Sequence, residues 1–212
     1  MLSWVHPRLL FRLLLCLLIF SPAAHAAQAA DAGDNALWQR LRSSDVIVLM
    51  RHAATTPGVG DPPGFELGKC ATQRNLSAAG RDDARAIGAA FRHHNIVPGA
   101  VWSSRWCRCL ETARLAFDQV KPEPTLDSMF NVDEASGAAR VRDLYNRLEE
   151  RRGMGPLVLV THDVNIRALT GEYVAQGEMV LTVLRDGRLQ VIGRLNAHSG
   201  RQAPAAASTG AR

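Results

Sequence analysis

Long apolar runs and strong charge of one sign are both scarce in this 212-residue sequence. The apolar run at Leu13–Phe20 holds only eight residues, whereas a membrane-spanning helix needs about twenty. No stretch resembles the basic stripe of a nucleic-acid-binding surface. With 47% hydrophobic and 21% charged residues, the composition is that of a globular domain, which excludes a membrane bundle and a disordered chain.

Metal ligands at useful spacings are also lacking. No suitably spaced histidine accompanies the close pair Cys107 and Cys109, so a zinc site is disfavoured. We expect no metal and no cofactor, and activity that survives EDTA. The net charge of +5 is a mild excess that suits a small anionic substrate, although it equally fits an ordinary solvated surface.

The N-terminus has the pattern of an export signal. Three basic side chains among the first twelve residues precede the apolar run, and Ala24-His25-Ala26 forms a small-x-small cleavage site. We therefore predict a signal peptide at 1–26 and a periplasmic or secreted chain with no stable membrane insertion after cleavage. A retained anchor is the alternative, which the short run disfavours.

Three cysteines remain after such cleavage, and an oxidising compartment would allow two of them to pair. Cys107 and Cys109 lie two apart on a predicted helix and point to different faces, so Cys70 is the expected partner in most geometries. Cys70–Cys107 is the first choice, and Cys70–Cys109 is a close alternative.

Hydrophobic periodicity predicts one domain at 27–195, followed by a flexible tail at 196–212. Buried strands alternate with amphipathic helices, and a hairpin closes on Asp186-Gly187. This order predicts an α/β three-layer sandwich with a mostly parallel central sheet. The predicted elements are strands at 45–50, 100–102 and 157–161, hairpin strands at 179–184 and 189–192, an extended piece at 124–126, and helices at 37–41, 77–91, 106–117 and 141–148.

Polar residues follow the three buried strands directly, at Arg51-His52, Ser103-Ser104 and His162. Ligands of parallel sheets bind beyond the carboxyl ends of the strands, so these side chains are expected to converge. Phosphoryl transfer needs a nucleophile, cations and an acid. A neutral His52 could be the nucleophile, while Arg51, Arg108 and His162 could surround the phosphate. Taken singly, a histidine or arginine at a strand end is more often a surface or capping residue than a catalytic one.

The sequence resembles the histidine phosphatase superfamily, which also includes the cofactor-dependent phosphoglycerate mutases. Leu49–Ala53 is similar to its Arg-His-Gly signature, and Asn75–Gly80 to its Leu-Thr-x-x-Gly segment. Ser103–Ala113 resembles its Ser-Ser-x-x-x-Arg-x-x-x-Thr-Ala segment, and Val160–His162 its second histidine. The order and spacing agree across roughly 45–171.

This resemblance implies a phosphoglycerate mutase-like fold in which His52 is phosphorylated. Arg51 and Arg108 would bind the phosphate, and His162 would stabilise the transition state. Arg105 stands where the family usually has proline.

The proton donor is less clear from the sequence. Small members of the family place a glutamate after the third strand, and 126–130 offers no clear match. Asp163 resembles the acid of the His-Asp pair in large acid phosphatases and phytases, and alternatively it only caps the next helix. Asp127, Asp133 and Glu134 are reserves.

The loop at 57–74 is expected to shape the substrate mouth, with Arg74 and Lys69 as candidate contacts, although Lys69 fits a solvated surface better. We expect an exported phosphomonoesterase acting on a small phosphorylated substrate, of which an envelope phosphosugar is one candidate. A non-catalytic phospho-ligand binding protein and a phosphomutase are the alternatives. The sequence leaves the oligomeric state open.

Overall fold

The computed structural model describes residues 33–58 and 60–196. The predicted signal peptide at 1–26, and the predicted tail beyond residue 196, lie outside these residues. Residues 33–40 are helical and lead into β1. The later elements are β1 Val46–Arg51, η1 Cys70–Thr72, α2 Ala78–His93, β2 Ala100–Ser103, α3 Cys107–Phe117, β3 Lys121–Pro122, η2 Pro124–Leu126, α4 Glu134–Glu150, β4 Leu157–Thr161, α5 Asp163–Thr170, β5 Met179–Arg185 and β6 Arg188–Leu195.

The described strands form one six-stranded sheet in the order β3-β2-β4-β1-β5-β6. The first four strands of that order pair in parallel, and β5 pairs antiparallel with both of its neighbours, β1 and β6, which confirms the mostly parallel sheet. The hairpin turns at Asp186 and Gly187, whose φ values of 50° and 70° suit a two-residue turn of the predicted kind. Within the described ranges, no helix is both long and apolar enough to cross a membrane.

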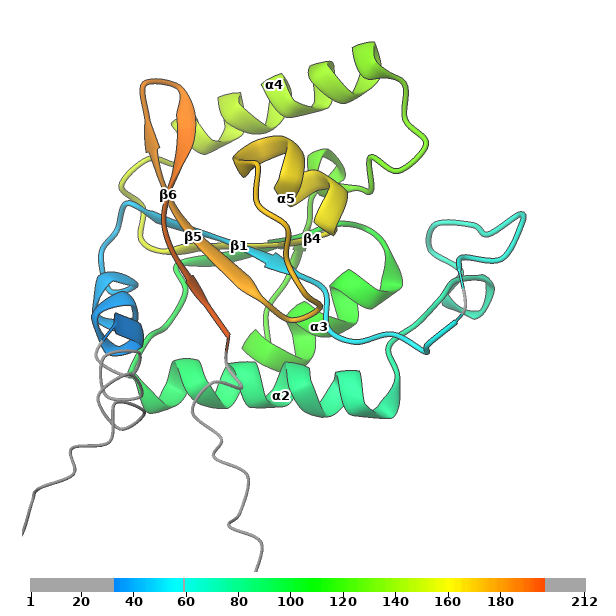
Figure 1. The fold of residues 1–212 in the computed structure, drawn as a ribbon, viewed down its shortest axis with the longest axis horizontal. Coiled ribbons are helices and arrows are strands. Elements are labelled where there is room, and N and C mark those ends of the chain that lie inside the picture. The colour runs from blue at the N-terminus through cyan, green and yellow to red at the C-terminus, as the bar shows by residue number, and fades with distance from the viewer. Residues whose placement is uncertain (1–32, 59, 197–212) are drawn as a thin grey trace, which may run out of the picture.

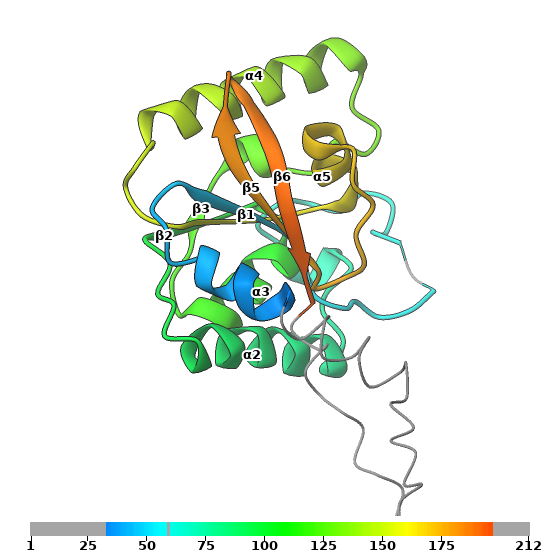
Figure 2. The ribbon, with the colours of Figure 1, turned by 60° about the vertical axis from the view of Figure 1, so that its left-hand side comes forward.

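Helices cover both faces of the sheet, as Figure 1 shows with α2 and α3 on one side and α4 and α5 on the other. Figure 2 shows the same layers after a turn of the molecule. Alternate side chains of β1 supply the two cores: Val48 and Met50 pack on the α2 and α3 side, whereas Leu49 packs on the α4 and α5 side. The strand is buried on both faces, which explains its continuous apolar run.

Two local predictions were wrong. The piece at 124–126 is a 3₁₀ turn rather than extended chain, because Pro124 begins it and the Glu123 carboxylate accepts a 3.2 Å hydrogen bond from the Thr125 N–H. On α3, Leu110 is only half-buried, and Cys109 occupies the core instead.

Candidate active site

His52 follows the last residue of β1 and is buried, with 2% of its surface exposed. Its Nδ1 lies 2.9 Å from the Ala53 carbonyl oxygen. A carbonyl can only accept, so Nδ1 carries the proton and Nε2 keeps its lone pair. Burial, aided by the charges of Arg108 and Arg51, lowers the pKa of His52 to about 3, although the bond to Ala53 opposes the shift. The imidazole is therefore neutral at neutral pH.

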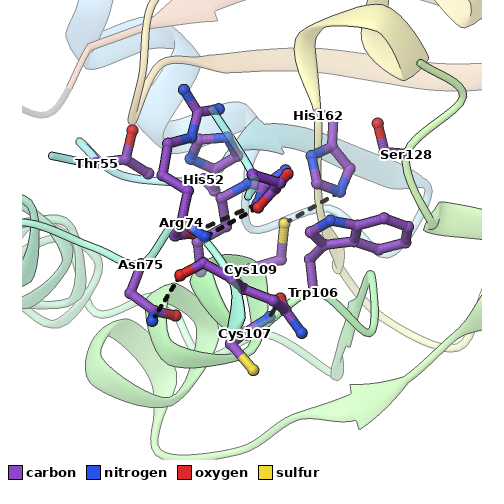
Figure 3. A network of polar contacts seen from close by, with 12 residues as sticks. His52, Thr55, Arg74, Asn75, Trp106, Cys107, Cys109, Ser128 and His162 are labelled. Carbon is purple, nitrogen blue, oxygen red and sulfur yellow. Dashed lines mark hydrogen bonds and ion pairs between the residues drawn. The ribbon is translucent and has the colours of Figure 1, made fainter. Parts of the chain in front are cut away.

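His162 follows β4 and is the N-cap residue of α5. Its ring centroid is 5.6 Å from that of His52, and its Nε2 is 2.9 Å from Ser104 Oγ. Figure 3 shows the His162 ring beside both the His52 ring and the Trp106 indole. Burial, and then the neighbouring His52 and Arg108, lower the pKa of His162 well below its usual value.

Arg51 and Arg108 line the same cavity as the two histidines. Arg51 donates a 2.8 Å hydrogen bond to the Val174 carbonyl oxygen, which fixes the guanidinium at the strand end. The Arg108 side chain is only 4% exposed, and its Nη1 donates to Asp61 Oδ1 at 2.9 Å. The Nε atoms of both arginines are buried and have no hydrogen-bond partner in the described part of the chain.

Asp61 is a site residue that the sequence did not single out. Its Oδ1 accepts 2.9 Å hydrogen bonds from both the Arg74 backbone N–H and the Arg108 guanidinium. Burial alone would raise the pKa of Asp61, but these two hydrogen bonds outweigh it, and the pKa lies below its usual value. The carboxylate lies among glycines and prolines in a long loop, so no local pattern marks it.

Two backbone anchors hold the segment after His52. The Ala53 N–H donates to Thr112 Oγ1 at 3.1 Å, and the Thr112 hydroxyl donates to the Arg108 carbonyl oxygen at 2.7 Å. The Ala54 carbonyl oxygen accepts from the Ser77 N–H at 3.0 Å, and Ser77 caps α2 as predicted. A Cβ on Gly80 would lie 1.8 Å from that Ala54 oxygen, so this helix position requires glycine.

A disulfide ties the mouth loop to the start of α3. It joins Cys70 to Cys107, which confirms the first choice of pairing. Cys109 is a free, buried thiol whose Sγ is 3.6 Å from His162 Nε2, and burial raises its pKa to about 12. The disulfide therefore lies next to Arg108 in the sequence, and the Cys109 thiol, which contacts His162, takes no part in it.

The candidate acids lie in different surroundings. Asp163 lines the cavity, is half-exposed, and is 3.7 Å from Arg51 Nη2. It is the first residue of α5 rather than its cap, which His162 provides. Asp127 also lines the cavity but is buried and held by Arg105. Asp133 caps α4, and neither it nor Glu134 belongs to the described lining of the cavity.

The cavity has a volume of about 780 Å³ and includes Arg74 in its lining, as the sequence predicted for the mouth loop. Lys69 does not line it: the ammonium pairs with Glu66 at 2.8 Å, and the side chain is 65% exposed. The loop therefore contributes an arginine and a carboxylate to the cavity. The arrangement provides a neutral nucleophilic imidazole surrounded by guanidinium groups, which suits capture of a phosphoryl group.

Comparisons with known proteins show similarity in sequence over part of the chain and in fold. A sequence model of the histidine phosphatase superfamily (branch 1) matches residues 47–131, which include His52 and Arg108 but end before β4. No curated protein matches the sequence significantly.

Solved structures of low sequence identity share the fold. The protein histidine phosphatase SixA, solved with tungstate, is 16% identical with a TM-score of 0.51, over 72% of this chain and 97% of its own. The α-ribazole phosphatase of Shigella flexneri is 19% identical with a TM-score of 0.52, over 69% and 94%. Phosphoserine phosphatase of Entamoeba histolytica, solved with 3-phosphoglyceric acid, is 14% identical with a TM-score of 0.54, over 73% and 98%. The chain is therefore similar in sequence to the histidine phosphatase superfamily over residues 47–131, and it shares its fold with these solved phosphatases.

Proposed function

We propose that this chain is an exported phosphatase that hydrolyses phosphate monoesters through a phosphohistidine at His52. The observation that carries the proposal is the hydrogen bond from His52 Nδ1 to the Ala53 carbonyl oxygen. It fixes the tautomer whose Nε2 lone pair can attack phosphorus, and the lowered pKa keeps that lone pair available.

The first step forms the bond between His52 Nε2 and phosphorus while the phosphorus–oxygen bond to the alcohol breaks. Its electron pair goes to the alcohol oxygen, which takes a proton from an acid. Arg51, Arg108 and His162 bind the non-bridging oxygens. In the second step water attacks phosphorus, the electron pair returns to Nε2, and the water proton goes to the same acid.

Asp163 is the proton donor in this proposal. It lines the cavity, is half-exposed, and lies 3.7 Å from Arg51 Nη2, so it adjoins the place where a phosphate held by Arg51 would release its alcohol. Both carboxylate oxygens of Asp127 already accept hydrogen bonds from Arg105, which leaves Asp127 less suited to donate. Asp163→Asn should slow esters with poor leaving groups far more than p-nitrophenyl phosphate.

The experiment that tests the function is turnover of p-nitrophenyl phosphate by the purified mature protein, with His52→Ala as control. This substrate has a good leaving group, so it tests the nucleophile without demanding the acid. We expect turnover, an acid-labile phosphoenzyme, the loss of both in the variant, and full activity in EDTA. A protein with neither turnover nor phosphoenzyme would leave phospho-ligand binding as its role.

Export and the substrate are parts of the proposal that rest on the sequence. The signal pattern at 1–26 supports export, and N-terminal sequencing of the mature protein from a periplasmic fraction tests it. The resemblance to small exported phosphatases makes a phosphosugar of the cell envelope one candidate substrate. A panel of phosphorylated sugars, nucleotides and phosphopeptides tests that choice.

A further inference from the structure

Exposed apolar side chains gather around the mouth of the cavity. Seven large apolar side chains are exposed among the described residues, and three of them, Phe65, Leu67 and Phe130, line this cavity. Phe130 is the most exposed of the three, at 71%. Such a concentration beside a polar floor is typical of a surface that binds the apolar part of a ligand.

The apolar surface begins at the phosphate site itself. The Trp106 ring centroid lies 5.5 Å from that of His162, and the Phe65 ring centroid lies 5.6 Å from that of Trp106. The rings therefore lead from the catalytic floor to the solvent. Phe130 and Val132 come from the segment between η2 and α4, so they add a second apolar wall from a different part of the chain.

The cations near these walls have partners within the protein. The Arg105 guanidinium donates to Asp127 at 2.7 Å through Nε, and Arg140 Nη1 donates to the carbonyl oxygens of Asp127 and Ser128 at 3.0 and 3.2 Å. Their hydrogen-bonding capacity toward hydroxyl groups of a sugar is thereby reduced. The side chains of Phe65, Trp106, Phe130 and Val132 offer apolar contact area, and Ser128 and Asn131 also line the cavity.

We propose that the preferred substrates are phosphate monoesters whose alcohol is apolar, an alkyl or aryl group that packs between the Phe65–Trp106 wall and the Phe130–Val132 wall. This inference rests on the proposed phosphatase function and names its substrate class. The phosphate occupies the floor between Arg51 and Arg108, and the alcohol occupies the remainder of the 780 Å³ cavity. A polar phosphosugar would gain little binding free energy from contact with these walls.

A series of n-alkyl phosphates from ethyl to octyl tests the proposal, because leaving-group acidity hardly changes along it. We expect kcat/KM to rise about two- to fourfold for each added methylene, and to exceed the values for glycerol phosphate and glucose 6-phosphate. The double variant Phe65→Ala/Phe130→Ala should flatten the series, while the inhibition constant of inorganic phosphate stays unchanged. Val97→Ala, an exposed apolar substitution outside the cavity lining, is the matched control.

The two proposals fail in different ways. A wild-type protein that turns over p-nitrophenyl phosphate but shows a flat alkyl series, or that prefers the sugar phosphate, overturns the apolar substrate class alone. A double variant that keeps the wild-type slope also overturns the substrate class and leaves the phosphatase function intact. A protein without p-nitrophenyl phosphate turnover overturns the phosphatase function, and the substrate class with it.

Discussion

The Asp61 carboxylate accepts a 2.9 Å hydrogen bond from the Arg108 guanidinium across a sequence separation of 47 residues. Arg108 is the buried cation assigned to the phosphate. The Asp61 carboxylate from the mouth loop therefore occupies one hydrogen-bond donor of Arg108. A phosphate that approaches this guanidinium is repelled by the negative charge of Asp61. Asp61 is expected to weaken anion binding and to speed the release of inorganic phosphate.

Asp61→Asn should tighten inhibition by inorganic phosphate or tungstate about tenfold, since it removes a charged competitor worth about 1.4 kcal/mol. The amide oxygen can still accept from the Arg74 N–H, so the loop keeps its anchor. Inhibition constants at pH 7 measure the effect, and Asp82→Asn on the exposed face of α2 is the control. Unchanged or weaker inhibition would show that Asp61 does not compete.

Gly80→Ala and Gly88→Ala separate a site effect from a packing effect. Each added Cβ would meet a backbone oxygen, that of Ala54 at 1.8 Å and that of Ala116 at 2.1 Å. Both variants should lose about 1–3 kcal/mol of unfolding free energy in urea. Only Gly80→Ala should also lower kcat/KM at 25 °C, because Ala54 lies two residues after His52, the proposed nucleophile. Equal activity losses would contradict this distinction.

Stability should fall in acid partly because of His52. Its pKa is about 3 in the folded protein, below the unfolded value of about 6.5. Between these values the unfolded chain binds the extra proton, so the unfolding free energy falls as the pH drops from about 6.5 to about 3. His52→Asn should make this fall shallower by up to about 1.4 kcal/mol per pH unit. Urea unfolding at pH 4.5, 5.5 and 7 measures the unfolding free energy of both proteins. If the free energy falls equally with pH in the wild type and the variant, His52 does not cause the loss of stability in acid.

The disulfide should stabilise the oxidised protein. Its closed loop spans 37 residues, for which chain entropy predicts about 2–4 kcal/mol. Cys70→Ser/Cys107→Ser should lower the melting temperature and weaken phosphate inhibition, because the bond tethers the mouth loop to the residue before Arg108. Dithiothreitol should shift the wild type toward the variant and leave the variant unaffected. A variant that melts like the oxidised wild type would show that the crosslink adds nothing.

Local pattern was sufficient for most of the fold. The apolar runs that became β1 and β4, the Ser77 cap and the Asp186-Gly187 turn all depend on neighbours in the sequence, and all are confirmed. The convergence of Arg51, His52 and His162 also followed, because adjacent parallel strands present their carboxyl ends at one edge. The prediction of extended chain at 124–126 is wrong because proline fits both extended chain and a 3₁₀ turn.

The sequence by itself determined the strand ends that carry the two histidines and the helix that carries Arg108, through hydrophobic periodicity. Only the tertiary structure decided what surrounds them. In the folded chain Cys70 bonds to Cys107 and not to Cys109, Asp61 pairs with Arg108, and Phe65 lies beside Trp106. These contacts join segments far apart in the chain, and their geometry depends on how the mouth loop folds over the sheet edge, which no local pattern encodes.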